Sequence, residues 1–346
     1  MTDATGLDVA ALDRWMRGAV GGLRGWPRVA RIRGGQSNPT FFVDYDGASF
    51  VLRKQPPGDL LPSAHAVDRE YRVMAALAAT PVPVPAMVAY CDDRAVLGTP
   101  FYLMERVAGR VFAGYALPGC TPAERRAMYA SMADTLAALH AVDPRAVGLA
   151  DFGRPGNYFE RQVARWTRQW ERSRTRANPW LERLIAWLPA NIPPGDDAAI
   201  CHGDYRVGNL MFDAVRPRVV AVLDWELATL GHPLADVAFN AMAWRTLPGE
   251  YGGLLGLDLR ALGIPDEAEH LARYYAQAGV RERAQPFHFA FALFRFAVIF
   301  EGIAARAAAG NAAADDAGEA GRLAPAFARR AVEIVDGRPP DLAPPA

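Results

Sequence analysis

The stretch from residue 202 to residue 224 constrains this chain more than any other. It contains H-G-D-Y-R-V-G-N, in which Asp204 and Asn209 are five residues apart, and it ends in A-V-L-D at Asp224. Two short apolar runs flank a polar turn at residues 213–218, which predicts a β-hairpin that brings Asp224 beside Asn209. Because Mg²⁺ prefers carboxylate and amide oxygens together with substrate phosphates, the sequence predicts a magnesium site on Asn209 and Asp224.

Each of these residues also has a simpler explanation. Asp and Asn are common in turns, and an isolated D-x-x-x-x-N occurs often by chance. Asp224 could cap a helix that starts at Trp225. The complete set in this order, with a hairpin between its parts, favours a functional site over a chance pattern.

The motifs of this stretch resemble those of a known family. H-G-D-x-x-x-x-N followed by D-x-E resembles the aminoglycoside phosphotransferase and choline kinase family of small-molecule kinases. More narrowly, the resemblance is to the kinase-like domain fused to some acyl-CoA dehydrogenases and to its stand-alone bacterial relatives. It rests on H-G-D-Y-R-V-G-N, L-D-W-E-L-A-T-L-G-H-P-L-A-D, L-R-K-Q-P-P-G and P-S-A-H-A-V-D-R-E-Y. It covers the chain from about Val29 to the 330s, with L-D-W in place of the D-F-G of protein kinases.

This resemblance implies an α+β, two-lobed protein-kinase-like fold. Residues 1–107 would form a β-rich, nucleotide-binding N-terminal lobe. Residues 108–346 would form a mainly helical C-terminal lobe with the catalytic loop and the acceptor site. The implied cofactors are ATP and Mg²⁺, and the implied role of Asp204 is to take the proton of the acceptor hydroxyl.

The N-terminal lobe begins with a pattern of strands around a glycine-rich loop. Strands are expected at residues 29–33, 40–45 and 49–54, with a tight turn at Asp46-Gly47. In the loop between the first two, the backbone at Gly35 and the hydroxyl of Ser37 could bind phosphates. Considered alone, the loop is better explained as a flexible hairpin connection.

The third strand ends in Arg53-Lys54, and one of these cations is expected to bind the nucleotide phosphates. Aligning F-V-L-R with the kinase V-A-I-K selects Arg53, and alternation along the strand turns Lys54 to the opposite face. A helix capped by Ser63 is expected next, with Val67, Tyr71, Met74 and Ala78 as its buried stripe. Glu70 lies beside this stripe, and as a buried charge it needs a cationic partner, either Arg53 or Lys54.

Further along, strands are expected at about 87–91 and 101–105, followed by an inter-lobe hinge. There the resemblance assigns the recognition of adenine to the backbone of Glu105 and Val107. The remaining chain is expected to be helical. A capping box at Thr121, with Pro at the first helical position, begins a helix over 122–140; two more follow at 158–173 and 180–188.

Several residues near the motif have expected roles that are not catalytic. By the family pattern, Asp236 heads a helix and hydrogen-bonds the catalytic loop. His232 fixes the loop before that helix. His140 could be a ligand, but its place at a helix C-terminus favours the role of complementing the helix dipole. Arg206 could meet the γ-phosphate or a substrate anion, or lie on the surface. Arg295 and Glu301 could be buried partners of each other or pocket groups.

Composition narrows the range of partners. The 346 residues carry 38 basic and 38 acidic side chains, a formal charge of zero, which argues against nucleic acid or an anionic membrane as the main partner. The N-terminus has no signal-peptide pattern. The apolar segment 287–300 is too short to span a bilayer. Three scattered cysteines are typical of buried residues in a reducing compartment. We therefore expect a cytoplasmic protein whose partner is a small-molecule acceptor; its oligomeric state is left open.

The expected function is ATP- and Mg-dependent phosphorylation of a small-molecule hydroxyl. The narrower resemblance points to a hydroxyacyl-CoA or a similar metabolite as the acceptor, with an aminoglycoside- or choline-type substrate as an alternative. Three further hypotheses are a nucleotide-binding pseudokinase that serves as an interaction module, a phosphoester hydrolase and a protein kinase. The complete set of Asp204, Asn209 and Asp224 argues against the pseudokinase.

Overall fold

The structure is a computed structural model that describes residues 6–32, 38–58, 65–154, 156–195, 197–280, 282–308 and 321–342. Gly35 and Ser37, the predicted phosphate-binding residues of the glycine-rich loop, lie outside these ranges. The chain divides into two compact units. The first comprises residues 1–109 and 220–228, and the second comprises residues 110–219 and 229–346.

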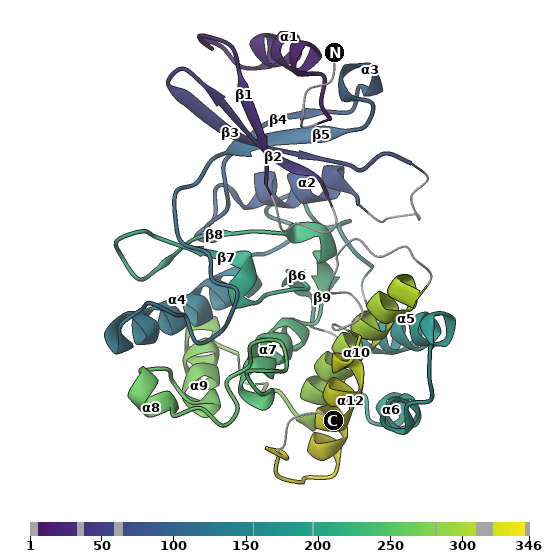
Figure 1. Ribbon diagram of the computed structural model, residues 1–346. Helices are drawn as coiled ribbons and strands as arrows, with labels where there is room; N and C mark the ends of the chain where they lie inside the picture. Colours follow the sequence, from purple (N-terminus) through teal and green to yellow (C-terminus); the bar gives the residue numbers. More distant parts are fainter. Residues whose placement is uncertain are drawn as a thin grey trace. The chain divides into compact units, whose positions relative to one another are not determined.

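The first unit is built on a five-stranded sheet with the order β1-β2-β3-β5-β4 (Figure 1). Its strands are β1 (Arg28–Arg31), β2 (Thr40–Tyr45), β3 (Ala48–Lys54), β4 (Met87–Cys91) and β5 (Phe101–Glu105). Its helices are α1 (Val9–Ala19), α2 (Val67–Leu77) and α3 (Arg94–Leu97), together with the 3₁₀ turn η2 (Trp225–Leu227). The strands expected from the sequence are therefore present, and all the neighbouring strands pair antiparallel.

The alternation of side chains between the two faces of a strand explains how this sheet packs on its core. Along β2 the burial alternates, and Phe41, Val43 and Tyr45 point into a core shared with Leu12 and Met16 of α1. The register between β2 and β3 pairs Tyr45 with Ala48 across the predicted Asp46-Gly47 turn, where Gly47 supplies the positive φ of 84° that such turns favour.

Helix α2 differs from its prediction in where it begins and in which face is buried. Its N-cap is Ala66, and Ser63, the predicted cap, lies outside the described residues. The buried positions are Val67, Glu70, Val73, Met74 and Leu77. The predicted stripe was therefore wrong at Tyr71, which is half-buried, and at Ala78, which is exposed. Glu70 lies within the buried stripe rather than beside it, because the apolar positions follow the i, i+3, i+7 rule from Val67.

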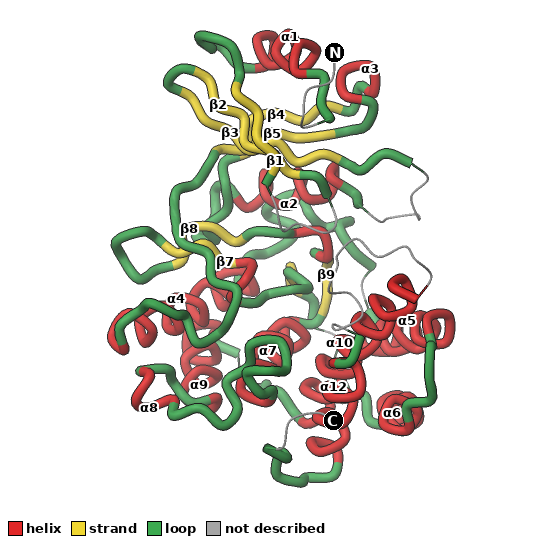
Figure 2. The backbone as a smooth tube through the Cα atoms, in the orientation of Figure 1, coloured by secondary structure: helices red, strands yellow, loops and turns green. Residues whose placement is uncertain are grey.

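The second unit is mainly helical (Figure 2). Its longer helices are α4 (Pro122–His140), α5 (Tyr158–Ser173), α6 (Pro179–Ala190), α7 (Pro233–Ala241), α9 (Glu267–Ala278), α10 (Pro286–Ala308) and α12 (Leu323–Val335). Shorter elements are β6 (Ala199–Cys201), η1 (Val207–Asn209), β7 (Leu210–Phe212), β9 (Thr229–Gly231), η3 (Met242–Arg245) and α8 (Leu259–Leu262). The two strands of the predicted hairpin are present as β7 and β8 (Val219–Val222), and the boundary between the two units falls within β8.

Helix α10 is the central helix of the second unit and packs against α12, α5 and α7 (Figure 1). Phe289, Leu293, Phe296 and Phe300 are buried on it, as their helical spacing predicts. By length and composition alone, Pro286–Ala307 is the one described helix that could cross a membrane, and 83% of its most apolar window is buried inside the protein. Helix α4 begins with the predicted capping box at Thr121.

Candidate functional site

In the first unit, Arg53 at the end of β3 lies among three carboxylates. Its Nε is 2.8 Å from Oε2 of Glu70, and its Nη2 donates to Oδ1 of Asp224 at 2.7 Å and lies 3.8 Å from Glu226. The Arg53 side chain is 13% exposed and that of Glu70 is 1% exposed. The sequence left the partner of Glu70 open between Arg53 and Lys54, and the structure selects Arg53.

Glu70 is held in place by more than its ion pair. Its Oε1 accepts a hydrogen bond from Nδ2 of Asn38 at 2.7 Å, and its Oε2 accepts one from the hydroxyl of Tyr102 at 3.0 Å. Both partners are buried. Burial raises the pKa of Glu70, and the neighbouring Arg53 opposes this shift. Hydrogen-bond donors on both oxygens are therefore what keeps a carboxylate at this depth.

The surroundings of Arg53 keep its guanidinium protonated. Burial by itself disfavours a charged guanidinium, but the carboxylates, Glu70 first, outweigh burial and raise the pKa of Arg53 above its usual value. The result is a fixed cation with a planar fork of donors, the geometry that suits phosphate oxygens.

Lys54 points to the opposite face of the sheet, as strand alternation predicts. Its Nζ donates to the hydroxyl of Thr99 at 2.5 Å, and its side chain is buried. Burial lowers the pKa of Lys54. Thr99 donates onward to the carbonyl of Gln55, so Lys54 ties the end of β3 to the chain before β5.

Asp224 lies in an unusual backbone conformation. Its φ of 63° is left-handed, a region that favours glycine or asparagine. It occupies the N-cap position of η2, but its side chain makes no capping hydrogen bond. The simpler explanation of Asp224 as a helix cap is therefore wrong. Its side chain instead meets Arg53, which holds one of its two carboxylate oxygens.

In the second unit, the catalytic-loop motif forms a compact hydrogen-bonded turn. Nδ2 of Asn209 donates to Oδ2 of Asp204 at 2.7 Å and to the Asp204 carbonyl at 2.9 Å. The Nε of Arg206 donates to the same Oδ2 at 3.3 Å. Because Asn209 uses its nitrogen as the donor, its Oδ1 is available as a ligand oxygen. An amide oxygen is one of the ligand types that Mg²⁺ accepts.

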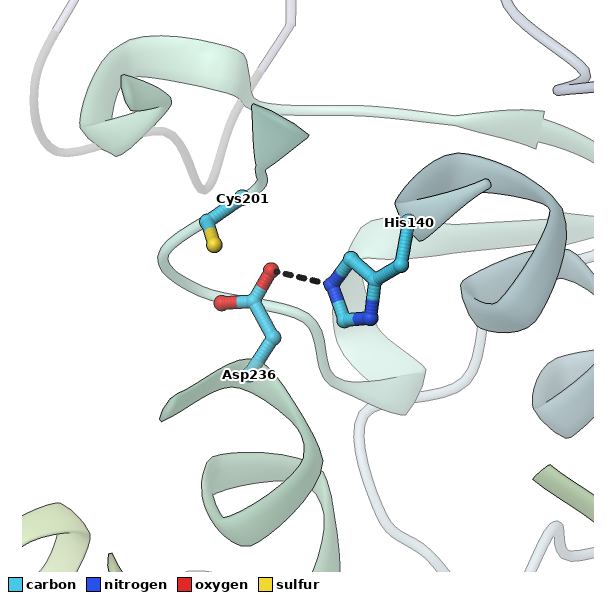
Figure 3. A group of neighbouring side chains, drawn as sticks. All are labelled: His140, Cys201 and Asp236. Atoms are coloured by element: carbon cyan, nitrogen blue, oxygen red, sulfur yellow. Dashed lines mark hydrogen bonds and ion pairs between the residues drawn. The ribbon is translucent and has the colours of Figure 1, made fainter. Parts of the chain in front are cut away.

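Asp236, at the start of α7, supports this turn (Figure 3). Its Oδ2 accepts from the backbone N–H of His202 at 2.6 Å, and its Oδ1 accepts from that of Gly203 at 2.9 Å. His140 lies 3.5 Å from Oδ2. Burial would raise the pKa of Asp236, but these hydrogen bonds and His140 hold it below its usual value. The predicted contact of Asp236 with the loop is confirmed.

His140 does more than complement a helix dipole, the role expected from the sequence. It ends α4, but its side chain is 3% exposed and bridges Asp236 and the Tyr274 hydroxyl, which lies 2.7 Å from Nδ1. Cys201 lies beside this pair (Figure 3). Burial raises the pKa of the Cys201 thiol well above its usual value. The group is a support for the loop. Only the fold brings α4 and α7 together here.

Arg295 of α10 also contacts the catalytic loop, which the sequence did not show. Its Nη2 donates to the carbonyl of Gly203 at 2.5 Å. The expectation that it could pair with Glu301 is wrong. Glu301 instead accepts hydrogen bonds from the backbone N–H and the hydroxyl of Thr175 and pairs with Arg176. Arg295 and Glu301 are six residues apart on one helix, so they point in different directions.

A small pocket adjoins the loop within the second unit. Arg206 lies over the ring of Tyr251, 5.4 Å from its centroid, and both line the pocket with Tyr115 and Phe239. Tyr251 has a positive φ of 66°. The loop that carries it is fixed by Glu250, which pairs with the buried Arg330 of α12 at 3.0 Å. Arg206 is therefore half-buried and in contact with Asp204 and Tyr251.

The predicted hinge lies at the end of β5. Glu105 is the last residue of this strand, and its N–H donates to the carbonyl of Ala86 at 2.9 Å. The N–H of Glu105 is therefore already engaged within the first unit. Val107 follows in the segment without regular structure that leads into the second unit.

These features define a phosphotransferase with a kinase-like, α+β fold, and comparison with known proteins gives its family. The profile of the phosphotransferase enzyme family that includes the aminoglycoside phosphotransferases matches residues 28–287, and the chain belongs to this family.

A solved structure from Ralstonia eutropha, assigned as a candidate aminoglycoside phosphotransferase, is 46% identical. It superposes with a TM-score of 0.87 over 96% of this chain and 99% of that chain. A thermostable mutant of the aminoglycoside phosphotransferase APH(4)-Ia, solved as a ternary complex with AMP-PNP and hygromycin B, is 18% identical over 92% of this chain and 98% of that chain. Its TM-score is 0.59, so it shows the shared fold alone.

Curated relatives are longer proteins. Acyl-CoA dehydrogenase family member 10 of Mus musculus is 40% identical over 93% of this chain and 30% of its own length. A probable acyl-CoA dehydrogenase, IBR3, of Arabidopsis thaliana is 40% identical over 88% of this chain and 40% of its own length. The chain thus spans about 30–43% of the length of the curated relatives it matches.

Proposed function

We propose that this protein transfers the γ-phosphoryl group of ATP, with Mg²⁺, to the hydroxyl of a small molecule in the cytoplasm. The observation that carries the proposal is the loop in which Asn209 and Arg206 fix the carboxylate of Asp204. In kinases a carboxylate in this position receives the proton of the acceptor hydroxyl. Membership in the phosphotransferase enzyme family supports phosphoryl transfer as the class of reaction.

The other roles follow from the same chemistry. Mg²⁺ would neutralise charge on the nucleotide phosphates, held by Oδ1 of Asn209 and by the carboxylate of Asp224. Arg53 is a cation already held in place by Glu70, so it can bind phosphate oxygens without a loss of side-chain freedom. In this proposal Lys54, buried against Thr99, is structural. Gly35, Ser37, Glu105 and Val107 would bind the nucleotide by their backbone and, for Ser37, its hydroxyl.

The acceptor is proposed to be a hydroxyacyl thioester such as a hydroxyacyl-CoA, or a similar metabolite. The relatives that continue into acyl-CoA dehydrogenases support an acyl compound. The cation of Arg206 beside Asp204 supports an acceptor with anionic or carbonyl oxygens. A polycationic aminoglycoside would be repelled at this position, because like charges in a half-buried site are unfavourable.

The experiment is ADP release with Mg·ATP, measured alone and with a panel of hydroxyacyl-CoAs, amino alcohols and aminoglycosides. The test variant is Asp204→Asn, and the matched control is Asp92→Asn, the same change at an exposed residue of the first unit. We expect a hydroxyacyl-CoA to stimulate turnover in the wild type and the control, with a loss of about 10³-fold or more in Asp204→Asn.

Two outcomes would contradict the proposal. Acceptor-stimulated turnover that survives in Asp204→Asn would remove the assigned base. Mg·ATP binding without stimulated turnover by any hydroxyacyl-CoA would exclude the proposed acceptor and favour a nucleotide-binding interaction module.

A further inference from the structure

Two arginines of the second unit share one indole ring. Arg165 and Trp166 are neighbours on α5, and Arg295 reaches them from α10, which packs against α5. The guanidinium carbon of Arg165 and that of Arg295 each lie 5.4 Å from the centroid of the Trp166 ring. Two cations held at one aromatic side chain repel each other unless an anion lies between or beside them.

The polar groups of this cluster are only partly satisfied. Nε of Arg295 and Nε1 of Trp166 are buried and have no hydrogen-bond partner among the described residues. Arg295 itself is 7% exposed, and it uses Nη2 on the carbonyl of Gly203. Within the same described part of the chain, neither arginine forms an ion pair with a carboxylate. Buried donors without acceptors are rare in folded proteins and usually mark a ligand or a water.

The electrostatics agree with this geometry. Partial burial of the Arg165 guanidinium, in a residue that is otherwise exposed, lowers its pKa, and the neighbouring Arg295 lowers it further. The site therefore carries an excess of positive charge that the described residues do not balance. An arriving anion would relieve this repulsion and would satisfy the free donors at once.

The cluster is connected to the catalytic loop. Gly203, whose carbonyl Arg295 holds, immediately precedes Asp204. The Arg295 guanidinium also lies 5.3 Å from the centroid of Phe239, and Phe239 lines the small pocket of Arg206 and Tyr251. The Arg295 side chain thus links the Gly203 carbonyl, next to Asp204, to the ring of Trp166.

We propose that Arg165, Trp166 and Arg295 form an anion-binding subsite for the acceptor, which takes a phosphate or phosphodiester group that the acceptor carries away from its reacting hydroxyl. This inference rests on the proposed phosphotransfer and deepens it by naming the acceptor as a phosphate-bearing compound. Arg295 would also be a positioning residue, since its bond to Gly203 links the bound anion to the catalytic loop.

The kinetic test uses Arg165→Gln, which changes an exposed side chain and leaves the core intact. Arg172→Gln is the matched control, because it removes the same charge about 10 Å further along α5. For an acceptor that carries a phosphate group, we expect the KM of the acceptor to rise about 10–100-fold in Arg165→Gln, the loss of one charge-assisted hydrogen bond. The KM of ATP and the activity toward the same hydroxy compound without its phosphate should stay as in the wild type.

A binding test decides the same question without turnover. The probe is inorganic phosphate, and the readout is the shift of the thermal unfolding midpoint across a phosphate titration. General salt effects and any phosphate in the nucleotide site act equally on all variants. We expect the wild type and Arg172→Gln to shift together, and Arg165→Gln and Trp166→Phe to shift less.

The outcomes separate this inference from the proposed function. Equal midpoint shifts in all four proteins would overturn the subsite. If acceptors turn over but Arg165→Gln behaves as Arg172→Gln, the subsite is wrong and the phosphotransferase stands. If no acceptor stimulates ADP release but the phosphate shift depends on Arg165, the anion site stands and the proposed reaction is wrong.

Discussion

The buried ion pair of Arg53 and Glu70 allows the sharpest prediction. In Glu70→Gln the side chain keeps its size but loses its charge, and its amide must place an NH₂ group where an oxygen now accepts from Asn38, Tyr102 or Arg53. At least one donor then faces another donor. Removal of one partner of a buried pair usually costs about 3–5 kcal/mol. Because Asp224 still holds Arg53 at 2.7 Å, we expect the lower end, about 3 kcal/mol.

The assay is urea unfolding followed by circular dichroism, with the free energy taken from the midpoint and the slope. The matched control is Asp68→Asn on the same helix, where the side chain is exposed in the first turn. It should cost about 0.5 kcal/mol, the value of a favourable helix-dipole charge. A double-mutant cycle with Arg53→Gln should give a coupling energy above about 1 kcal/mol.

The reasoning is refuted if Glu70→Gln lies within about 0.5 kcal/mol of Asp68→Asn. Such a result would mean that Asp224 and Glu226 satisfy Arg53 by themselves, and that Glu70 does not position it. If stability falls as predicted, the KM of ATP should rise in the same variant, because a displaced Arg53 binds phosphate less well.

Three further predictions concern the second unit. Burial, and the nearby His232, lower the pKa of His288 to about 4, below its usual value of 6.5. As pH drops, the unfolded chain therefore binds a proton at this histidine before the folded protein does, and the free energy of unfolding falls by about 2 kcal/mol between about pH 7 and about pH 5. In His288→Phe, urea unfolding at each pH should show a smaller fall in this free energy. In Gly253→Ala the added Cβ would overlap the carbonyl oxygen of Thr246, so we expect a loss of about 1–3 kcal/mol in thermal unfolding, and an unchanged midpoint would contradict this. In Asp236→Asn one backbone N–H of the catalytic loop loses its acceptor, which should cost about 1–3 kcal/mol, and unaltered hydrogen exchange at His202 would argue against this role.

The local parts of this protein were readable from the sequence, because they depend on neighbours along the chain. The capping box at Thr121, the turn at Asp46-Gly47 and the alternation that separates Arg53 from Lys54 were all predicted and are present. The prediction of the buried stripe of α2 was less accurate, because either Tyr71 or Val73 could be a buried position of an amphipathic helix and only packing selects between them. The motif at residues 202–224 was sufficient to predict the family.

What the sequence could not give are contacts whose partners lie far apart along the chain. Nothing in the order of residues joins Arg295 to Gly203, His140 to Asp236, or Glu70 to Arg53 rather than Lys54. These contacts form because helices and strands pack by shape and bury their charges in pairs, and many pairings would satisfy the same pattern of apolar and polar positions. The sequence by itself therefore determined the chemistry of the loop and the secondary structure around it. Only the tertiary structure decided which buried side chains hold that loop, and which two arginines gather at one indole ring without a carboxylate among the described residues to balance them.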